Sequence, residues 1–409
     1  MSKLALDSVR WEEYKLNTLF EFKLSKGDNQ ASLLEEGNIP LISSGLNTNG
    51  ITKFIKNGDG KALIFGEKTI TIDMFGKAFY HDYSYFSVSH GRVNILIPKF
   101  TINKYIAAFL ITVIDNSFSN IFSYNRMCSQ NRLNSTKILL PTTLEGMPNW
   151  QFMEDYIKQE ISLQSQSLSS YYEDKLIRLA SDLLNAKEQH NDSPCFDSFK
   201  NINSEIILYK SDKDCVSNFY KENLFNEIYT IAKNWKEKYS LKNTAWKEFF
   251  IEDVCEINSG KDIYERERID GNTPYVTATA SNNGIGYFIS NKNTTYQRNC
   301  ISVNRNGSVG YSFYHEYGAL FGNDTRKLTP KIKDPYIAKF ISFMISEQKD
   351  KYGYGYKMGT GRLKRQKILL PVQEDDTIDY NFMRKYMITR KVEIIQNILK
   401  RYSNYTLNT

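Results

Sequence analysis

The sequence predicts an α+β protein in which a β-rich domain occurs twice and each copy is followed by a long helix. Three observations lead to this fold class. Short motifs occur twice in the same order along the 409 residues. Runs of strand length, separated by Gly, Asn and Asp, fill both copies. A stripe of apolar residues at helical spacing then follows each copy.

The duplicated motifs define the two copies. The first copy opens at Trp11 in WEEYKLNTLFEF, and the second opens at Trp246 in WKEFFIEDVCEI. GNIPLISSGLNTNGI then matches GNTPYVTATASNNGI, ITIDMFG matches ISVNRNG, and FYH, KYIAAFL/PYIAKFI and KILLP follow in both copies. A duplicated domain is the only simple source of such an order, so we predict domains at 1–148 and 246–376. Identical positions should mostly maintain the fold, among them Trp11/Trp246, Pro40/Pro274 and Gly76/Gly307.

Each copy reads as a twisted, mostly antiparallel β domain with small helices. ALIF, TITID and VNILI in the first copy, and CISVN and GYSFYH in the second, have strand length and β-branched or aromatic residues. KYIAAFLITVI reads as a helix. MCSQNRL in the first copy aligns with MGTGRL in the second, and we expect this loop to differ in shape between the copies.

A helix is predicted over 149–190 and a second over 377–409, because Gly and Pro are absent from 149–188 and both segments carry an apolar stripe. We expect the two helices to pack as an antiparallel, coiled-coil-like stalk. The alternative is that each helix packs on its own domain. Residues 191–245 have no counterpart after the second copy; they contain a loop and a helical segment that either extends the stalk or docks a partner.

Composition narrows the class of protein. Hydrophobic residues make up 41% and charged residues 24%, as in ordinary globular proteins. The net charge of +7 is compatible with nucleic-acid binding. Five isolated cysteines without a CxxC pair fit a reduced cytoplasm and exclude familiar zinc spacings. The amino-terminal residues lack the apolar core of a signal peptide, and no apolar run reaches about 20 residues. We expect a cytoplasmic protein with no metal.

Catalytic motifs are missing from the sequence. There are no adjacent prolines, as an amino-methyltransferase motif would require, no GxGxxG after a strand and no GxxxxGK[ST]. Glu173-Asp174-Lys175 has the ExK shape of nuclease sites, but it lies in the middle of a helix and reads as a solvated face. The duplicated His81/His315 reads as a packed, hydrogen-bonded histidine. We therefore expect a non-catalytic protein, with an unrecognised nuclease or methyltransferase as the weaker alternative.

The duplicated motifs resemble the specificity (S) subunits of Type I restriction–modification systems and their Type IIB relatives. The residues that carry the resemblance are W-[KE]-E-[FY], G-N-x-P, N-G-I, I-[ST]-[IV]-[DN]-x-x-G, F-Y-H and I-L-L-P in both copies, with MPNWQFMEDYI at the entry to the first long helix. The resemblance covers nearly the whole chain except 191–245.

The resemblance implies a function and a set of partners. Each β-rich domain would be a target-recognition domain that reads one half of a bipartite site in double-stranded DNA. The helices would set the distance between the halves and bind methyltransferase subunits, two of them, with restriction subunits as further partners. The methyltransferase would hold S-adenosylmethionine and methylate adenine, and this chain would bind no cofactor. A stand-alone DNA-binding or scaffold module is the alternative.

Positions that differ between matched loops are the better candidates for reading bases. Arg pairs well with guanine and Asn with adenine, so Arg305 and Asn306 are candidates, as are Met74 and Phe75 at the matching positions. The polar loops add further residues, although Asn-Gly is also common in turns. These are Asn47, Asn49, Thr277, Thr279, Asn282 and Asn283.

Two further sets of residues complete the prediction. Cations near the loops are candidates for phosphate contacts, each with solvated surface as the alternative. These are Lys77, Arg92, Arg126, Arg132, Arg326, Lys357, Arg362 and Lys364. The apolar stripes of the helices are candidates for partner binding. These are Met153, Ile157, Ile161, Leu168, Tyr172, Leu176, Met383, Met387, Ile394 and Ile398.

Overall fold

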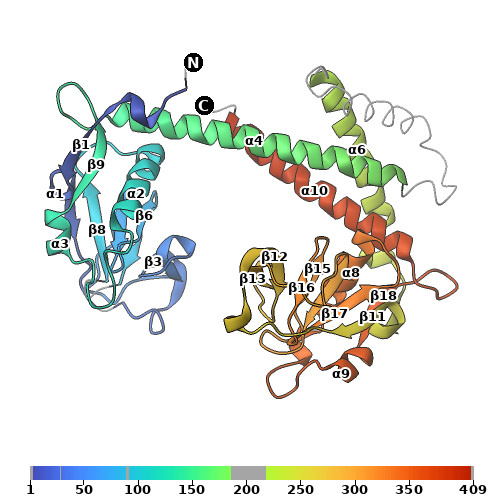
Figure 1. The fold of residues 1–409 in the computed structure, drawn as a ribbon. Helices are drawn as coiled ribbons and strands as arrows, with labels where there is room; N and C mark the ends of the chain where they lie inside the picture. Colours follow the sequence, from blue (N-terminus) through green and yellow to red (C-terminus); the bar gives the residue numbers. More distant parts are fainter. Residues whose placement is uncertain (1–2, 28, 89–91, 186–217, 407–409) are drawn as a thin grey trace. The chain divides into compact units, whose positions relative to one another are not determined.

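The computed structural model describes residues 3–27, 29–88, 92–185 and 218–406. The chain divides into two compact units, one formed by residues 1–168 with 402–409 and the other by residues 169–401 (Figure 1). Each unit contains one copy of the repeat. No helix among the described residues is long and apolar enough to cross a membrane.

The first unit contains three small sheets. An antiparallel ribbon joins its first and last strands, β1 (Arg10–Lys15) and β9 (Lys137–Thr142). A four-stranded antiparallel sheet has the order β2 (Phe20–Lys23), β8 (Val93–Pro98), β5 (Thr69–Asp73), β6 (Ala78–His81). A three-stranded sheet has the order β4 (Ile51–Ile55), β3 (Glu36–Ile42), β7 (Phe86–Ser87), with β3 and β7 parallel. The helical elements are η1 (Leu6–Ser8), α1 (Leu16–Leu19), η2 (Thr48–Gly50), α2 (Lys104–Phe118) and α3 (Gln130–Ser135).

The second unit repeats this topology strand for strand. Its ribbon pairs β10 (Trp246–Phe250) with β18 (Lys367–Pro371). Its larger sheet has the order β11 (Cys255–Ser259), β17 (Thr325–Pro330), β14 (Cys300–Asn304), β15 (Ser312–His315). Its smaller sheet has the order β13 (Ile285–Ile289), β12 (Asp270–Val276), β16 (Leu320–Phe321). The helical elements are η3 (Leu241–Asn243), α7 (Ile251–Val254), η4 (Glu265–Glu267), η5 (Asn282–Gly284), α8 (Pro335–Ser346), η6 (Lys349–Lys351) and α9 (Thr360–Lys364).

The first and last motifs of each repeat meet in the ribbon. Trp11 is the cross-strand partner of Pro141, and Trp246 is the partner of Pro371. Each indole ring stacks on a phenylalanine of the domain helix, with ring centroids 6.1 Å and 6.3 Å apart, and each indole N–H donates to a carbonyl five residues upstream. The predicted structural role of the two tryptophans is therefore confirmed: they fix the point where each domain closes.

The duplicated histidine is buried in both units. His81 Nε2 lies 2.8 Å from Thr71 Oγ1, and His315 Nε2 lies 2.8 Å from Ser302 Oγ. The Nδ1 atoms lie 3.1 Å and 3.2 Å from the hydroxyls of Tyr83 and Tyr317. Burial lowers the pKa of both imidazoles to about 4, because a charged ring would lose its hydration. The histidines are structural, as the sequence predicted.

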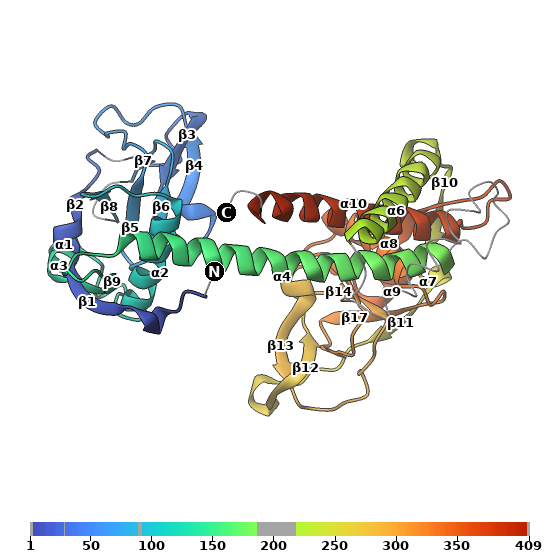
Figure 2. The ribbon, with the colours of Figure 1, turned by 90° about the horizontal axis from the view of Figure 1, so that it is seen from above.

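Three long helices extend from the domains: α4 (Trp150–Asn185), α6 (Asn218–Lys238) and α10 (Tyr380–Thr406). The first turns of α4 and α10 pack on a domain: Met153 lies in the core of the first unit, and Met383 lies in the core of the second. Farther along, the part of α4 within the second unit packs against α6 and α10 in a cluster that includes Leu176, Ile228 and Ile388. In this region α4 and α10 run in opposite directions (Figures 1 and 2).

Both interpretations of the helices from the sequence therefore apply, each to a different stretch: the first turns of α4 and α10 pack on their own domains, and later turns pack on other helices. The antiparallel packing of α4 and α10 is present within the second unit, but α6 adds a third helix to it. Lys221 of α6 pairs with Glu173 of α4, so the ExK-like triplet carries an interhelical ion pair rather than a nuclease site. Residues 186–190 of the predicted first helix and residues 191–217 of the unassigned segment lie outside the described residues.

A polar link ties each domain helix to the long helix that follows. Asn103 caps α2 through Oδ1, and its Nδ2 donates to Glu154 of α4 at 2.8 Å. In the second unit Asp334 caps α8, and Arg384 of α10 donates to its Oδ2 at 2.8 Å. The two links occupy matching positions with opposite polarity, because the long helix supplies the acceptor in one unit and the donor in the other.

Candidate nucleic-acid interface

Four loop segments meet beyond the end of β5 in the first unit. The backbone N–H of Met74 donates to the carbonyl of Arg92 at 2.9 Å, and the N–H of Cys128 donates to the carbonyl of Met74 at 2.8 Å. Ser44 Oγ also donates to the Arg92 carbonyl, at 3.0 Å. These bonds hold the segments around 44, 74–77, 92 and 123–128 together where β5 ends and β8 begins.

The corresponding loops meet beyond the end of β14 in the second unit. The N–H of Arg305 donates to the carbonyl of Asp324 at 2.8 Å, which repeats the bond between Met74 and Arg92. Asn304 Nδ2 donates to the carbonyl of Thr279 at 2.9 Å, and the N–H of Ser308 donates to the carbonyl of Ala278 at 3.1 Å. The same backbone frame therefore carries different side chains in the two units.

The side chains on this frame differ in chemistry. In the second unit Arg305 pairs with Asp324 at 3.1 Å, and Asn306 Nδ2 donates to the same carboxylate at 3.4 Å. Arg305 Nε has no hydrogen-bond partner among the described residues. The structure thus brings together Arg305 and Asn306, two predicted base-reading residues, around one acidic side chain, and the Nε of Arg305 is buried behind them.

The first unit presents an apolar surface at the matching place. Phe75 lies beside Tyr124, with ring centroids 6.1 Å apart, and Phe75, Tyr124 and Met127 are all exposed. Arg92 occupies the position of Asp324 and is also exposed. Behind this surface Asp73 is buried; burial raises the pKa of its carboxyl, while N–H groups of Phe75 and Lys77 donate to its Oδ1 at 2.9 Å. Asp73 therefore fixes the loop that carries Phe75.

The polar loops lie beside this surface, but some of their residues have turn roles. Asn49 and Asn283 both have positive φ, and each donates through Nδ2 to a backbone carbonyl and to a tyrosine hydroxyl. Their geometry is that of turn residues. Asn47 and Asn282 are exposed at the two turns, while Thr277 and Thr279 are half-buried.

The candidate phosphate contacts fall into three groups. Arg326 corrects the prediction: it is buried, and its guanidinium donates to Thr360 Oγ1 at 2.7 Å and to the carbonyl of Asn323 at 2.8 Å. Burial, followed by the nearby Arg305, lowers its pKa. Lys77 is paired with Asp115, and Lys364 lies 4.0 Å from Glu252. The remaining candidates are exposed or half-buried near the loops: Arg92, Arg126, Arg132, Lys357 and Arg362.

Burial also corrects several residues predicted to bind partners. Met153, Leu176 and Met383 are fully buried inside their own unit, so their side chains contact this chain itself. Ile157, Tyr172 and Met387 are partly buried against the same clusters. Leu168 and Ile394 are exposed, and Ile161 and Ile398 are half-buried. An apolar stripe contains both internal and external contacts, and only the exposed part is available to another protein.

Two features of the interface were missed from the sequence. Asp324 was not selected, although its match to Arg92 follows once the strands are paired. Tyr124 and Tyr354 were not selected either, although they lie four residues before the buried Cys128 and Met358 in both units. MCSQNRL and MGTGRL each follow a tight bridge and lead into a short helix, so the expected difference in shape is wrong.

Comparison with known proteins settles the family. The model of the Type I restriction modification DNA specificity domain matches residues 8–170 and 243–401. The chain belongs to this family. It is a DNA specificity subunit of a restriction–modification system with two recognition domains.

Two of the similar proteins align with nearly the whole length of the chain. The Type II restriction enzyme BgcI specificity subunit S.BcgI of Heyndrickxia coagulans is 29% identical over 95% of this chain and 96% of that protein. The crystal structure of the Type-I restriction-modification system S subunit from M. genitalium is 15% identical, with a TM-score of 0.49 over 99% of this chain and 95% of that chain. Among the described residues no group of three His, Cys, Asp or Glu side chains is placed to hold a metal ion.

Proposed function

We propose that this specificity subunit reads a bipartite DNA target, with one half assigned to residues 1–148 and the other to residues 246–376, and performs no bond chemistry itself. The observation that carries the proposal is the matched backbone frame with unmatched side chains. The bond from Met74 to Arg92 repeats as the bond from Arg305 to Asp324, while the side chains at these two positions change from methionine and arginine to arginine and aspartate. Two readers of the same design with different surfaces suit two different half-sites.

The two domains gain from being joined in one chain. Each reading surface is small, so one domain alone would bind weakly. Linking two weak sites raises the effective concentration of the second once the first is bound, and this sharpens selection of targets with the correct spacing. We propose that the long helices set this spacing.

The proposed partners are two methyltransferase subunits, with restriction subunits as further members of the complex. The methyltransferase would hold S-adenosylmethionine and extrude the target adenine from the stack, since the base cannot be reached inside a duplex. This chain would hold the duplex, bind no cofactor and act in the cytoplasm. Exposed apolar residues on the helices, such as Leu168 and Ile394, are the proposed contacts for these subunits.

Methylation mapping tests the proposal. The chain is expressed with and without the neighbouring methyltransferase gene, and modified adenines in host DNA are located by single-molecule sequencing. A bipartite motif that requires both proteins is expected. A motif that persists without this chain, or no motif at all, would reject the specificity role.

A chimera then assigns the half-sites. In it, residues 246–388 replace residues 11–158, so that each domain keeps the first turns of its own long helix. The chimera is expected to methylate a motif whose two halves are the same. A motif identical to that of the natural chain would contradict the assignment of one half-site to each domain.

A further inference from the structure

Each unit carries a tight hairpin beside its reading loops. Ser123 and Arg126 exchange two backbone hydrogen bonds of 3.1 Å and 3.0 Å, and Gly353 and Tyr356 exchange two of 3.3 Å and 3.1 Å. A tyrosine occupies the same place at each tip. Tyr124 is 75% exposed and Tyr354 is 87% exposed. The two tips therefore present the same aromatic side chain to solvent from a rigid turn.

An arginine supports each hairpin at its base. Arg132 Nη1 donates to the carbonyl of Met127, and Arg362 Nη1 donates to the carbonyl of Lys357 at 2.8 Å. Both arginines are exposed. A guanidinium has five N–H donors, so one such bond orients the group and leaves several donors for another ligand. Arg362 also lies 4.0 Å above the ring of Tyr356, which further restricts its position.

The hairpins are fixed to the same frame as the reading loops. Cys128, at the end of the first hairpin, is fully buried and donates its N–H to the carbonyl of Met74. In the second unit, Met358 is equally buried, and Thr360 accepts a hydrogen bond of 2.7 Å from Arg326, the neighbour of Arg305. A molecule that lies across Met74 or Arg305 would therefore also come near the hairpin.

The residue at the hairpin tip is a tyrosine in both units and is exposed in both, and these two facts together indicate what the hairpin contacts. An exposed tyrosine on a loop tip adds little to folding stability, so stability does not explain its presence in both copies. Both domains contact the same polymer, but they face different bases. Side chains that differ, such as Met74 and Arg305, suit the bases. Side chains that are the same suit the sugar–phosphate backbone, which every half-site offers in the same form.

We propose that Tyr124 with Arg132, and Tyr354 with Arg362, form two copies of a sequence-independent clamp on the DNA backbone. The arginine donates to a phosphate oxygen with the N–H groups that the carbonyl leaves free. The tyrosine hydroxyl at the tip donates to an adjacent phosphate. This clamp sets the height and register of the duplex, so that the neighbouring loop reaches the base edges. The inference rests on the proposed reading of DNA by both domains.

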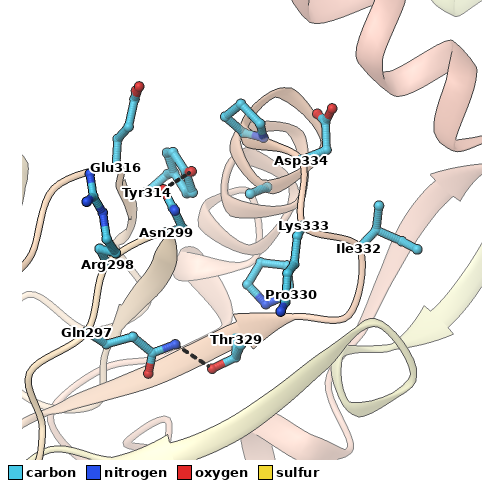
Figure 3. Close-up of a pocket in the computed structure, with 12 residues that line it drawn as sticks. Gln297, Arg298, Asn299, Tyr314, Glu316, Thr329, Pro330, Ile332, Lys333 and Asp334 are labelled. Atoms are coloured by element: carbon cyan, nitrogen blue, oxygen red, sulfur yellow. Dashed lines mark hydrogen bonds between the residues drawn. The ribbon is translucent and has the colours of Figure 1, made fainter. Parts of the chain in front are cut away.

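The opposite end of β14 offers matched controls. A pocket of about 560 Å³ lies there, and it is lined by Arg298 and Lys333 as well as by Glu316 and Asp334 (Figure 3). Its lining carries two cationic and two acidic side chains whose formal charges cancel, so we expect no preference for a phosphate there. Arg298 and the nearby Tyr296 are also exposed, Tyr296 to 60%, but they lie at the opposite end of β14 from the reading loops.

The test measures binding of the purified full-length chain to duplexes of random sequence and to duplexes enriched by selection on the natural chain. Affinity is measured at several salt concentrations for Arg362→Ala, Arg132→Ala, Tyr354→Phe and Tyr124→Phe. Arg298→Ala and Tyr296→Phe serve as controls. Each arginine variant is expected to weaken binding to both pools about tenfold at low salt and to reduce the slope of log K against log salt by about one. Each tyrosine variant should weaken both pools by a smaller, equal factor.

The outcomes separate the clamp from the reading function. Binding by the clamp variants that matches the controls, while the natural chain binds its selected sequence, would overturn the clamp and leave the reading function intact. A change in the selected sequence of Arg362→Ala would make Arg362 a base reader and also overturn the clamp. Failure of the natural chain to bind any duplex would instead contradict the proposed function.

Discussion

Replacing Ile388 with alanine tests the three-helix cluster of the second unit. Ile388 lies on α10, is fully buried and packs in the cluster that includes Leu176 and Ile228. The change removes three buried carbon groups, each worth about 0.8 kcal/mol on transfer from water, or about 2.4 kcal/mol together. The cavity left behind adds to this, so we expect unfolding to cost about 3–4 kcal/mol less in the variant.

Ile394→Ala is the matched control. Ile394 lies on the same helix, but it is 55% exposed, and the same substitution there should change stability by less than about 0.5 kcal/mol. Urea unfolding followed by tryptophan fluorescence compares the two, because Trp235 packs against the cluster. With a slope of about 3 kcal/mol per molar urea, the midpoint of Ile388→Ala should fall by about 1 M. Equal midpoints for the two variants would refute the packing argument.

Three further outcomes follow. Arg305→Ala should weaken binding to the selected target by about 1–3 kcal/mol and relax one base position of one half-site; selection from random duplexes checks this, and an unchanged motif would exclude Arg305 as a reader. His315 has a pKa of about 4 in the folded chain, below its unfolded value of about 6.5. Its neutral ring therefore contributes about 3 kcal/mol to folding stability above pH 6.5, and this contribution is lost as the pH falls towards 4. The urea midpoint of His315→Gln should vary less than that of the natural chain over this range, and an equal variation would exclude His315 as the source. Gly307 has φ +57°, and a Cβ there would lie 2.6 Å from the carbonyl oxygen of Ala278. Gly307→Ala should therefore lower the stability of the fold by about 1–3 kcal/mol, whereas Gly361→Ala, with open space around it, should not. Calorimetry compares the two variants, and equal melting temperatures would contradict the steric argument.

Much of the fold could be predicted because the repeat doubles every signal. TITID coincides with β5 and CISVN with β14, since both are buried on both faces and carry β-branched residues. ALIF was a wrong prediction: of these residues only Phe65 forms a bridge, to Tyr85, because Leu63 and Ile64 are exposed. Apolar composition alone does not tell a strand from a loop whose side chains face solvent.

The interface was less predictable from sequence. Arg305 and Asn306 were selected because they differ from Met74 and Phe75 within a matched strand end, and their role as base readers stays a prediction. Arg326 was misassigned, because a cation on a strand gives no sign of which face it occupies, and here that face is internal. The stripes on the helices had the same difficulty: spacing locates the apolar side of a helix, but the partner that covers Met153 or Met383 is set by the tertiary fold.

The reversed polarity of the two helix links bears on how such genes can exchange parts. If the second recognition domain replaced the first and were joined directly to α4, Asp334 would lie against Glu154. Two carboxylates would then meet where a hydrogen bond of 2.8 Å now forms. The reverse insertion would face Asn103 with Arg384 and lose the ion pair. Recombination that moves a domain to the other position would then succeed best when the crossover lies after the first turns of the long helix. The unit of inheritance for a new DNA specificity would be the domain together with the start of its helix.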